Sequence, residues 1–256
     1  MNKIRVVLLA GDGESTKLMF NGIKAEFFVQ RVIIENSKSK VQLIRRRIVT
    51  LGVFKVVGQV FFMIYNLLWL QKQSKKRIIE IKQDKKLFDK KIDNDLILKV
   101  DTINCKEVAD ILQKINPDVV VVNGTRIISD KILNSIGVEF INTHVGITPN
   151  YRGVHGGYWA LTECDKENCG VTIHLVDSGV DTGGILYQET IDISKSDTFN
   201  TYPYLQISLA IPLMKRAIKN VASQSYKIQV NNAPSKLWTH PTILEYFKYR
   251  YLHGVK

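Results

Sequence analysis

An amide and an imidazole lie two residues apart at Asn142 and His144, where an apolar run that begins at Phe140 meets a loop rich in Gly, Pro and Asn. The apolar run predicts a buried β-strand, and alternation along a strand places positions i and i+2 on one face. Because ligands of open α/β sheets bind at the carboxyl ends of strands, both side chains are placed to meet a ligand. Together they suit a carbonyl oxygen that becomes negative during attack. The alternative is structural, with Asn142 capping a turn and His144 hydrogen-bonded in the loop.

The elements around this pair predict an α/β protein. Continuous apolar runs indicate buried strands, and the segments between them have helical spacing. This alternation is typical of a doubly wound, mostly parallel sheet, a Rossmann-like fold. The expected strands cover residues 4–10, 27–34, 97–100, 118–123, 140–142, 170–176 and 185–190.

We expect a catalytic domain over residues 1–200 and a helical, aromatic-rich extension over 201–256. Residues 36–95 form a basic insertion in the first of these. Between Lys38 and Lys91 there are 15 Lys and Arg residues and three acidic ones, so this segment has a net charge of +12. The net charge of the whole chain is also +12. All the excess positive charge therefore lies in this segment, which indicates an anionic partner.

The centre of the insertion is an apolar stretch from Ile48 to Leu70, preceded by three arginines and followed by a Lys-rich run. Lys55, Gln59 and Asn66 form a narrow polar stripe on an otherwise apolar helix. A helix over residues 45–77 that lies in a membrane surface is one interpretation. The other is a helix packed on its own domain or on the second subunit of a homodimer. A membrane span is disfavoured, because the strands on either side are expected in one sheet.

A Gly-rich loop over residues 177–184 carries Asp181 and completes a pattern with Asn142-x-His144 and the loop around Tyr151 and Arg152. In this combination the sequence resembles the formyltransferases that use 10-formyltetrahydrofolate, closely over residues 118–190. The resemblance implies that Asn142, His144 and Asp181 form the catalytic trio. The amide and a protonated His144 would stabilise the charge on the formyl oxygen. Asp181 would raise the pKa of His144 and accept the proton of the attacking amine.

The resemblance also implies where the folate would bind. Gly124, Arg126, Ile127 and Ile128 would line it from one side and Asp177 from the other, with the two isoleucines as its apolar wall. For Arg126 a surface salt bridge is the competing interpretation.

Further residues are candidates for the acceptor substrate. Gly11 and Gly13 form a Gly-x-Gly turn between a strand and a helix, which either holds a phosphate or is a plain tight turn. Tyr151, Arg152 and His155 would lie at the substrate entrance, although His155 is equally consistent with a helix start. No metal site is expected, since no ligand spacing such as HExxH is present.

The chain most resembles the members that N-formylate amino sugars, usually nucleotide-linked, for surface polysaccharide, so the expected acceptor is the amine of such a sugar. The chain after the catalytic core is too short for the barrel expected on a methionyl-tRNA formyltransferase, and no nucleic-acid partner is expected. Glycinamide ribonucleotide, methionyl-tRNA, hydrolysis of the folate and a non-catalytic membrane adaptor remain alternatives. Three cysteines without a close CxxC pair fit a reducing compartment, hence the cytoplasm or its membrane face.

Overall fold

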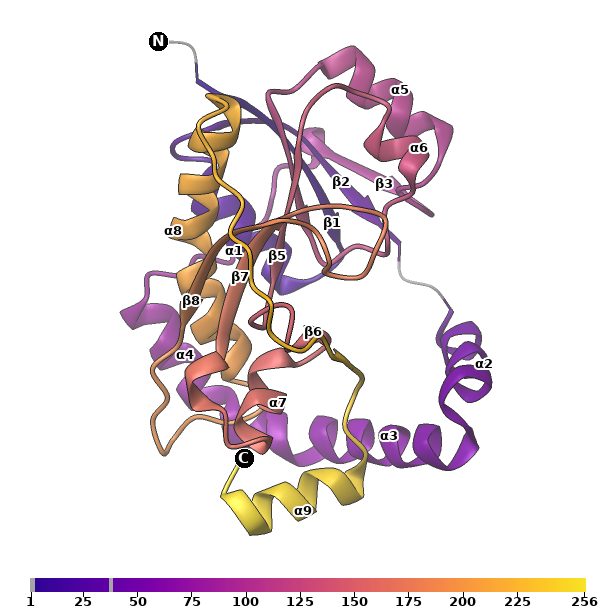
Figure 1. The fold of residues 1–256 in the computed structure, drawn as a ribbon, viewed down its shortest axis with the longest axis vertical. Helices are drawn as coiled ribbons and strands as arrows, with labels where there is room; N and C mark the ends of the chain where they lie inside the picture. The colour runs from indigo at the N-terminus through magenta and orange to yellow at the C-terminus, as the bar shows by residue number, and fades with distance from the viewer. Residues whose placement is uncertain (1–2, 37–38) are drawn as a thin grey trace.

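The computed structural model describes residues 3–36 and 39–256, and its centre is a seven-stranded sheet (Figure 1). The first five strands in spatial order are parallel, whereas the β5–β7 and β7–β8 pairs are antiparallel. The predicted mostly parallel α/β sheet is confirmed. In spatial order the strands are β3 (Ile97–Val100), β2 (Phe28–Glu35), β1 (Arg5–Gly11), β4 (Val119–Asn123), β5 (Phe140–His144), β7 (Gly170–Leu175) and β8 (Ile185–Thr190).

Helices cover both faces of the sheet. On one face lie α1 (Glu14–Ile23) and α8 (Tyr202–Ala222), and on the other α5 (Lys106–Ile115) and α6 (Asp130–Leu133). The side chains of β1 and β4 alternate between the two cores, as expected for strands buried on both sides. Because α8 belongs to the same core as β1, a boundary at residue 200 does not separate two cores.

Smaller elements complete the chain. They are a second sheet of β6 (Arg152–Gly153) and β9 (Leu237–Trp238), the helices α7 (Gly156–Thr162) and α9 (Ile243–His253), and the 3-10 turns η2 (Asn94–Leu96) and η3 (Lys166–Asn168). A capping box between Thr242 and Glu245 starts α9, and Gly254 in the left-handed region ends it.

The insertion between β2 and β3 is helical, but it is not one helix over residues 48–70. It comprises α2 (Lys40–Leu51), α3 (Val53–Tyr65), a π-helical turn η1 (Asn66–Leu70) and α4 (Gln71–Asp84). The prediction missed a break at Gly52, whose φ of +83° lies in the region that favours glycine. Beyond the break the helical run continues further than predicted, because Ile81 and Leu87 pack into the core beside α1 and α8.

Candidate active site

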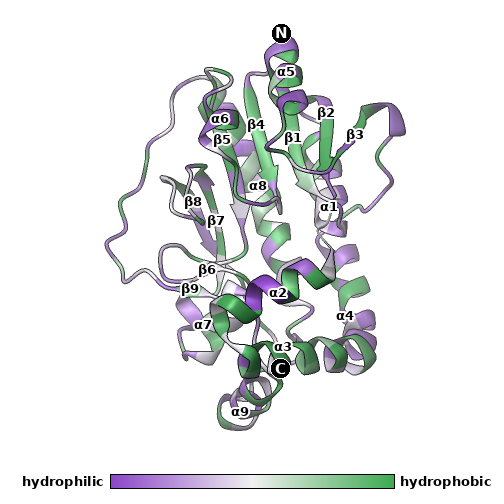
Figure 2. Cartoon of the chain, turned by 90° about the vertical axis from the view of Figure 1, so that its right-hand side faces the viewer, coloured by the Kyte–Doolittle hydropathy of each residue, from purple (hydrophilic) through white to green (hydrophobic). Residues whose placement is uncertain are grey.

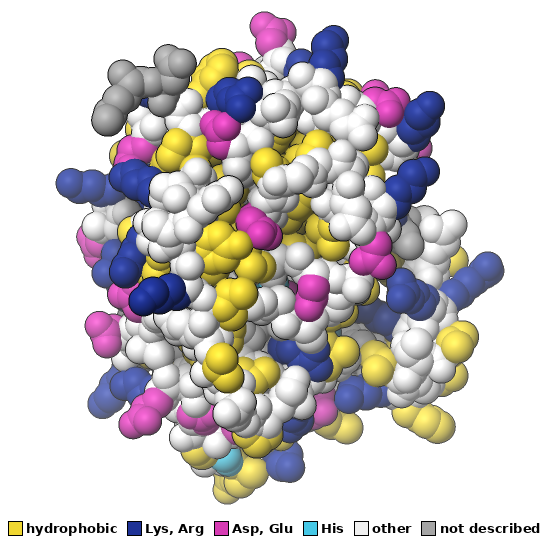
Figure 3. All heavy atoms as spheres, turned by 45° about the horizontal axis from the view of Figure 1, so that its top comes forward, with side chains coloured by type: hydrophobic (Ala, Val, Ile, Leu, Met, Phe, Trp, Pro, Cys, Tyr) yellow, Lys and Arg dark blue, Asp and Glu magenta, His cyan; other side chains and the backbone are white. Residues whose placement is uncertain are grey.

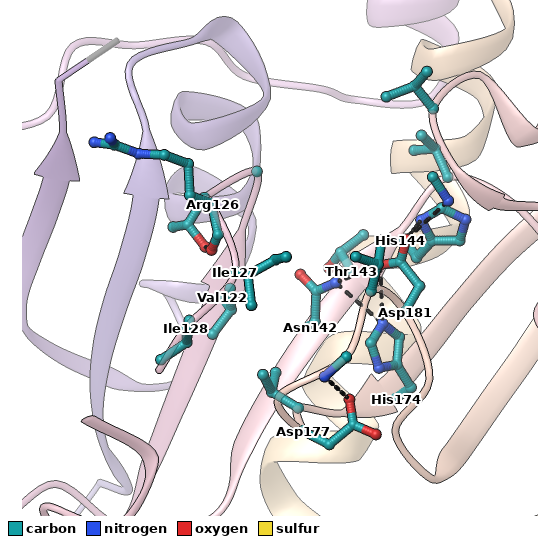
Figure 4. Close-up of a pocket in the computed structure, with 18 of the residues that line it drawn as sticks. Val122, Arg126, Ile127, Ile128, Asn142, Thr143, His144, His174, Asp177 and Asp181 are labelled. Atoms are coloured by element: carbon teal, nitrogen blue, oxygen red, sulfur yellow. Dashed lines mark hydrogen bonds and ion pairs between the residues drawn. The ribbon is translucent and has the colours of Figure 1, made fainter. Parts of the chain in front are cut away.

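Asn142, His144 and Asp181 come together at the carboxyl end of β5 (Figure 4). Oδ1 of Asp181 lies 3.5 Å from Nδ2 of Asn142, and Oδ2 lies 3.3 Å from Nδ1 of His144. Strand alternation places Asn142 and His144 on one face of β5, as the sequence predicted. The backbone N–H of Gly153 donates to Oδ2 of Asp181 at 3.0 Å and fixes the carboxylate. The predicted trio therefore shares one small volume.

His174 is a fourth member of this cluster that the sequence did not identify. In the antiparallel pair of β5 and β7 it lies opposite Asn142. Its Nδ1 is 2.6 Å from the carbonyl oxygen of Leu175, which only accepts, so Nδ1 carries a proton. Its Nε2 lies 3.1 Å from the amide nitrogen of Asn142, which donates. The sequence does not place His174 in the site, because the register of two antiparallel strands cannot be read from one sequence.

The contacts of Asn142 and His174 fix which way the amide points. With its nitrogen directed at Nε2 of His174, Asn142 presents Oδ1 on the cavity side (Figure 4). Both N–H donors of the amide are engaged, since Nδ2 also lies 3.5 Å from Oδ1 of Asp181. An N–H donor toward the cavity therefore requires the amide to turn over, which places its Oδ1 against Nε2 of His174 and requires a proton there. The hydrogen-bond role of Nε2 of His174 thus sets whether Asn142 offers the cavity a donor or an acceptor.

His144 is buried, and both of its ring nitrogens contact the protein. Nε2 donates to the carbonyl oxygen of Tyr151 at 2.6 Å, while Nδ1 faces Asp181. Burial lowers the pKa of His144 and is the larger cause, whereas the charge of Asp181 raises it. Asp181 therefore raises the pKa of His144 as expected, but desolvation outweighs this contribution and the net pKa is lowered.

Asp181 itself has a lowered pKa. Burial would raise it, but Nε2 of His174, which lies 3.6 Å from Oδ1, the charge of His144 and the Gly153 N–H together lower it. The carboxylate is therefore ionised near neutral pH, as required of a group that is to accept a proton. Its φ of +51° is uncommon for a residue other than glycine and directs the side chain into the cluster.

A cavity of about 680 Å³ opens beside this cluster. Its other wall is the end of β4 and the loop after it, where Val122, Ile127 and Ile128 present apolar side chains (Figure 4). Ile127 is 50% exposed, which is high for a large apolar side chain and leaves its surface open to a ligand. Apolar walls with a few polar groups at one end are typical of sites for small organic molecules.

The structure places the predicted folate residues at this cavity, but not all by their side chains. Gly124, with a φ of +71°, Arg126 and Asp177 line it. The guanidinium of Arg126 points away and pairs with the buried Glu35 at 2.9 Å (Figure 4). Asp177 accepts hydrogen bonds from the Thr182 hydroxyl within its own loop.

The predicted substrate residues separate into two groups. Gly11 and Gly13 line a neighbouring cavity of about 350 Å³ that shares Gly124 and Arg126 with the first. At Gly11 a Cβ would lie 2.6 Å from the carbonyl oxygen of Gly124, so the close approach of β1 and β4 requires glycine.

The side chains of the other three point elsewhere. The Tyr151 hydroxyl donates to Asp165, Arg152 donates to the carbonyl oxygen of Val180, and the partly buried His155 lies with its Nε2 2.9 Å from Nδ1 of His240. Tyr151 contributes its backbone carbonyl to the site, through His144, and not its ring.

One helix of the insertion also reaches the cavity. Arg46 of α2 lines the larger cavity, and Leu43 lines the smaller one. Within the residues that the structure describes, no group of three or more His, Cys, Asp or Glu side chains has the arrangement of a metal site.

Residues 68–204 match the family model described as Formyl transferase. The match covers more than half of the chain and includes Asn142, His144 and Asp181. The chain belongs to the formyl transferase family.

Curated relatives match over part of their own length. The methionyl-tRNA formyltransferase of Finegoldia magna is 41% identical over 92 residues, which are 36% of this chain and 29% of that protein. The methionyl-tRNA formyltransferase of Kosmotoga olearia is 29% identical over 150 residues, 56% of this chain and 48% of that protein. The matched residues therefore span less than half the length of these relatives.

Solved structures share the fold over nearly the whole chain. Phosphoribosylglycinamide formyltransferase from Anaplasma phagocytophilum has a TM-score of 0.57 at 15% identity, covering 92% of this chain and 98% of that one. A sugar N-formyltransferase from Shewanella sp FDAARGOS_354 has a TM-score of 0.54 at 16% identity, covering 92% and 76%. At these identities the similarity to solved structures shows a shared fold. Of the resemblance that the sequence indicated, membership of the family is the part that is confirmed.

Proposed function

We propose that this protein transfers a formyl group from 10-formyltetrahydrofolate to the amine of an amino sugar in the cytoplasm. The observation that carries the proposal is the convergence of Asn142, His144 and Asp181 beside a cavity with an apolar wall. Ile127 and Ile128 would cover one face of the flat folate ring, and backbone groups of Gly124 and the 177–181 loop would bind its polar edge. When bound, the folate supplies the formyl carbon and its carbonyl oxygen.

The side chains of the cluster then have separate tasks. Asn142, turned so that its N–H faces the cavity, donates to the oxygen on which negative charge grows. His174 holds the amide in that orientation and is a positioning residue. The ionised Asp181 would take the proton of the attacking amine, directly or through one water, and His144 would share it. The same pair would return the proton to the folate nitrogen as the bond between that nitrogen and the formyl carbon breaks.

The smaller cavity supports a nucleotide-linked acceptor. Gly13 occupies the position before α1 and makes no side-chain capping bond, so N–H groups of the first turn remain available for a phosphate. The shared boundary at Gly124 and Thr125 would place the sugar amine next to the formyl group.

A second candidate acceptor is methionyl-tRNA. The curated relatives carry that name, and the net charge of +12 suits a polyanionic substrate. Glycinamide ribonucleotide is a third, since a fold neighbour acts on it by name.

One experiment separates these acceptors. The protein is incubated with 10-formyltetrahydrofolate and with dTDP-, UDP- or GDP-linked amino sugars, glycinamide ribonucleotide, methionyl-tRNA or no acceptor. Mass spectrometry then reads the gain of a formyl group. The proposal predicts formylation of a sugar nucleotide; formylation of the tRNA alone, or loss of the formyl group without any acceptor, would contradict it.

A further inference from the structure

The helical insertion turns its apolar side outward. Phe54 is 95% exposed and Phe61 59% exposed, although both lie in the most apolar helix of the chain. Exposed apolar side chains recur every three or four residues along α3 and η1, which places them on one face. They are Phe54, Val57, Phe61, Ile64 and Leu68.

Two of the three residues of the polar stripe, Gln59 and Asn66, face the protein, whereas Lys55 is exposed. Nε2 of Gln59 donates to the carbonyl oxygen of His240 at 2.7 Å, and Oδ1 of Asn66 accepts from Asn200 at 2.7 Å. Val56 and Phe62 are buried beside them. The helix is thus fixed to its domain by its narrow side, and its broad apolar side is left outside.

Helix α9 extends this apolar surface. The Tyr65 ring lies 5.2 Å from that of Phe247 and 5.6 Å from that of Trp69, and the latter two are about half exposed. Leu244 and Tyr251 are 78% and 89% exposed. We call this surface, from α3 and η1 to α9, the α3–α9 face; both elements lie at the end of the molecule opposite α5 and α6 (Figure 1).

Basic side chains border the α3–α9 face. The outward row of α3 continues into α4 with Lys72 and Lys75, both exposed, and Arg45 of the preceding helix α2 is exposed as well. Figure 2 shows α3 as a mostly hydrophobic helix next to the mixed helix α2, and Figure 3 shows basic and hydrophobic side chains together over α2. Within the described part of the chain, the ion pairs of this segment are those of Arg77 and Lys82.

We propose that the α3–α9 face docks on a lipid bilayer with anionic headgroups, with the axis of α3 in the plane of the surface. Apolar and aromatic side chains would enter the boundary between headgroups and acyl chains, while the flanking Arg and Lys side chains bind the headgroups. Trp69 and Tyr251 are of the residue types that favour this interface. The excess charge of +12 within residues 38–91 is complementary to such a surface.

The structure disfavours two other arrangements. The run Val53–Asp84 is long and apolar enough to cross a membrane. However, it joins β2 and β3, which pair side by side in one sheet, and a crossing would leave these strands on opposite sides. A second copy of the chain on the α3–α9 face would bring like-charged borders together, whereas an anionic surface neutralises them.

Binding to vesicles tests the proposal with the protein alone, so the result does not depend on any formyl acceptor. Wild-type protein should co-sediment with phosphatidylcholine vesicles that contain about a third phosphatidylglycerol, and not with phosphatidylcholine alone. Binding should weaken between roughly 0.1 M and 1 M salt, as screening removes the headgroup contacts. Phe54→Gln with Phe61→Gln should lower binding about tenfold or more.

Matched variants on other surfaces distinguish binding through the α3–α9 face from nonspecific binding to vesicles. Phe28→Gln with Phe88→Gln changes two phenylalanines that are 54% and 58% exposed away from the face, and should bind as wild type does. Neutralising four border residues to Gln should remove the salt-dependent part of binding, whereas neutralising four exposed lysines of other surfaces should not. The first set is Arg45, Lys72, Lys75 and Lys76, and the second is Lys106, Lys114, Lys131 and Lys227.

Two outcomes would overturn the proposal. One is no binding to anionic vesicles at low salt. The other is a wild-type dimer by light scattering that Phe54→Gln with Phe61→Gln converts to a monomer, since a second copy would then cover the face. Unaltered circular dichroism of each variant ensures that lost binding reflects the face and not the fold.

Discussion

Oδ2 of Asp181 lies 3.3 Å from Nδ1 of His144, while the other nitrogen of that ring donates to a backbone carbonyl. Because Nε2 already carries its proton, a second proton between Nδ1 and the carboxylate is what makes the contact attractive. The side chains of His144 and Asp181 can therefore share one proton that comes from another group. The proposed role of Asp181 as acceptor of the amine proton follows from this arrangement.

His174 is predicted to act through Asn142. His174→Leu removes the partner that orients the amide, and a misplaced donor should lower kcat roughly a hundredfold with little change in the KM of the acceptor. His174→Gln, which can also contact the amide, should recover part of the rate but change the shape of the pH profile of kcat. An unchanged profile in His174→Gln would contradict the positioning role.

The partly buried pair of His155 and His240 should make stability depend on pH. Burial lowers the pKa of His155 to about 3 and that of His240 to about 4. Below the ordinary histidine pKa of 6.5, these two side chains are protonated in the unfolded chain but not in the folded one. The free energy of unfolding therefore falls as the pH decreases from about 6.5 toward 4. Thermal unfolding at pH about 7.5 and about 5 measures this loss.

The matched variants for this prediction differ in exposure. Replacing both partly buried histidines by Phe should reduce the difference in Tm between the two pH values. Replacing the exposed His253 by Gln should leave that difference as in the wild type. An equal pH dependence in all three proteins would show that this pair is not its source.

Ile127 should matter for binding of the folate. Its side chain is half exposed at the cavity wall, so Ile127→Asp places a charge where a flat ring is expected to lie. We expect the KM for 10-formyltetrahydrofolate to rise about tenfold or more, with Tm nearly unchanged. Val230→Asp, at a position that is 84% exposed, is the control and should change neither quantity. An Ile127→Asp enzyme with the wild-type KM would remove this wall from the site.

Gly183 should be required for the loop that carries Asp181. A Cβ at this position would meet the carbonyl oxygen of Leu175 at 1.8 Å, so the loop and β7 cannot both keep their places. Gly183→Ala should lower the free energy of unfolding by about 2 kcal/mol or more and reduce turnover. Gly137→Ala, where a Cβ meets nothing within 4 Å, should change stability by less than about 1 kcal/mol. Similar stabilities of the two variants would contradict this reasoning.

The sequence predicted the sheet and the trio because both depend on local patterns. Unbroken apolar runs such as Val119–Val122 indicate buried strands, and the period of two relates Asn142 to His144. The resemblance of the 177–184 loop to a known motif then supplied Asp181. Each of these features can be inferred without knowing which distant segments pack together.

Other parts of the site depend on packing between distant segments. The place of His174 depends on the antiparallel register of β5 and β7, and the lowered pKa of His144 depends on how deeply the ring is buried. Arg126 is of a residue type that often binds ligands, but its guanidinium forms an ion pair with Glu35 of a separate strand. The insertion is a further example. Its sequence shows that Gln59 belongs to a polar stripe, but not that this side chain faces the protein, where it donates to the carbonyl oxygen of His240.

The most direct test is formyl transfer by wild type, Asp181→Asn and the exposed control Asp192→Asn, with 10-formyltetrahydrofolate and the best acceptor. Asp181→Asn keeps the shape of the side chain but cannot take the proton, so kcat should fall by about two to three orders of magnitude while the folate still binds. Asp192→Asn should retain the wild-type rate. Equal rates for wild type and Asp181→Asn would contradict the central claim that this carboxylate acts with Asn142 and His144 on one formyl group.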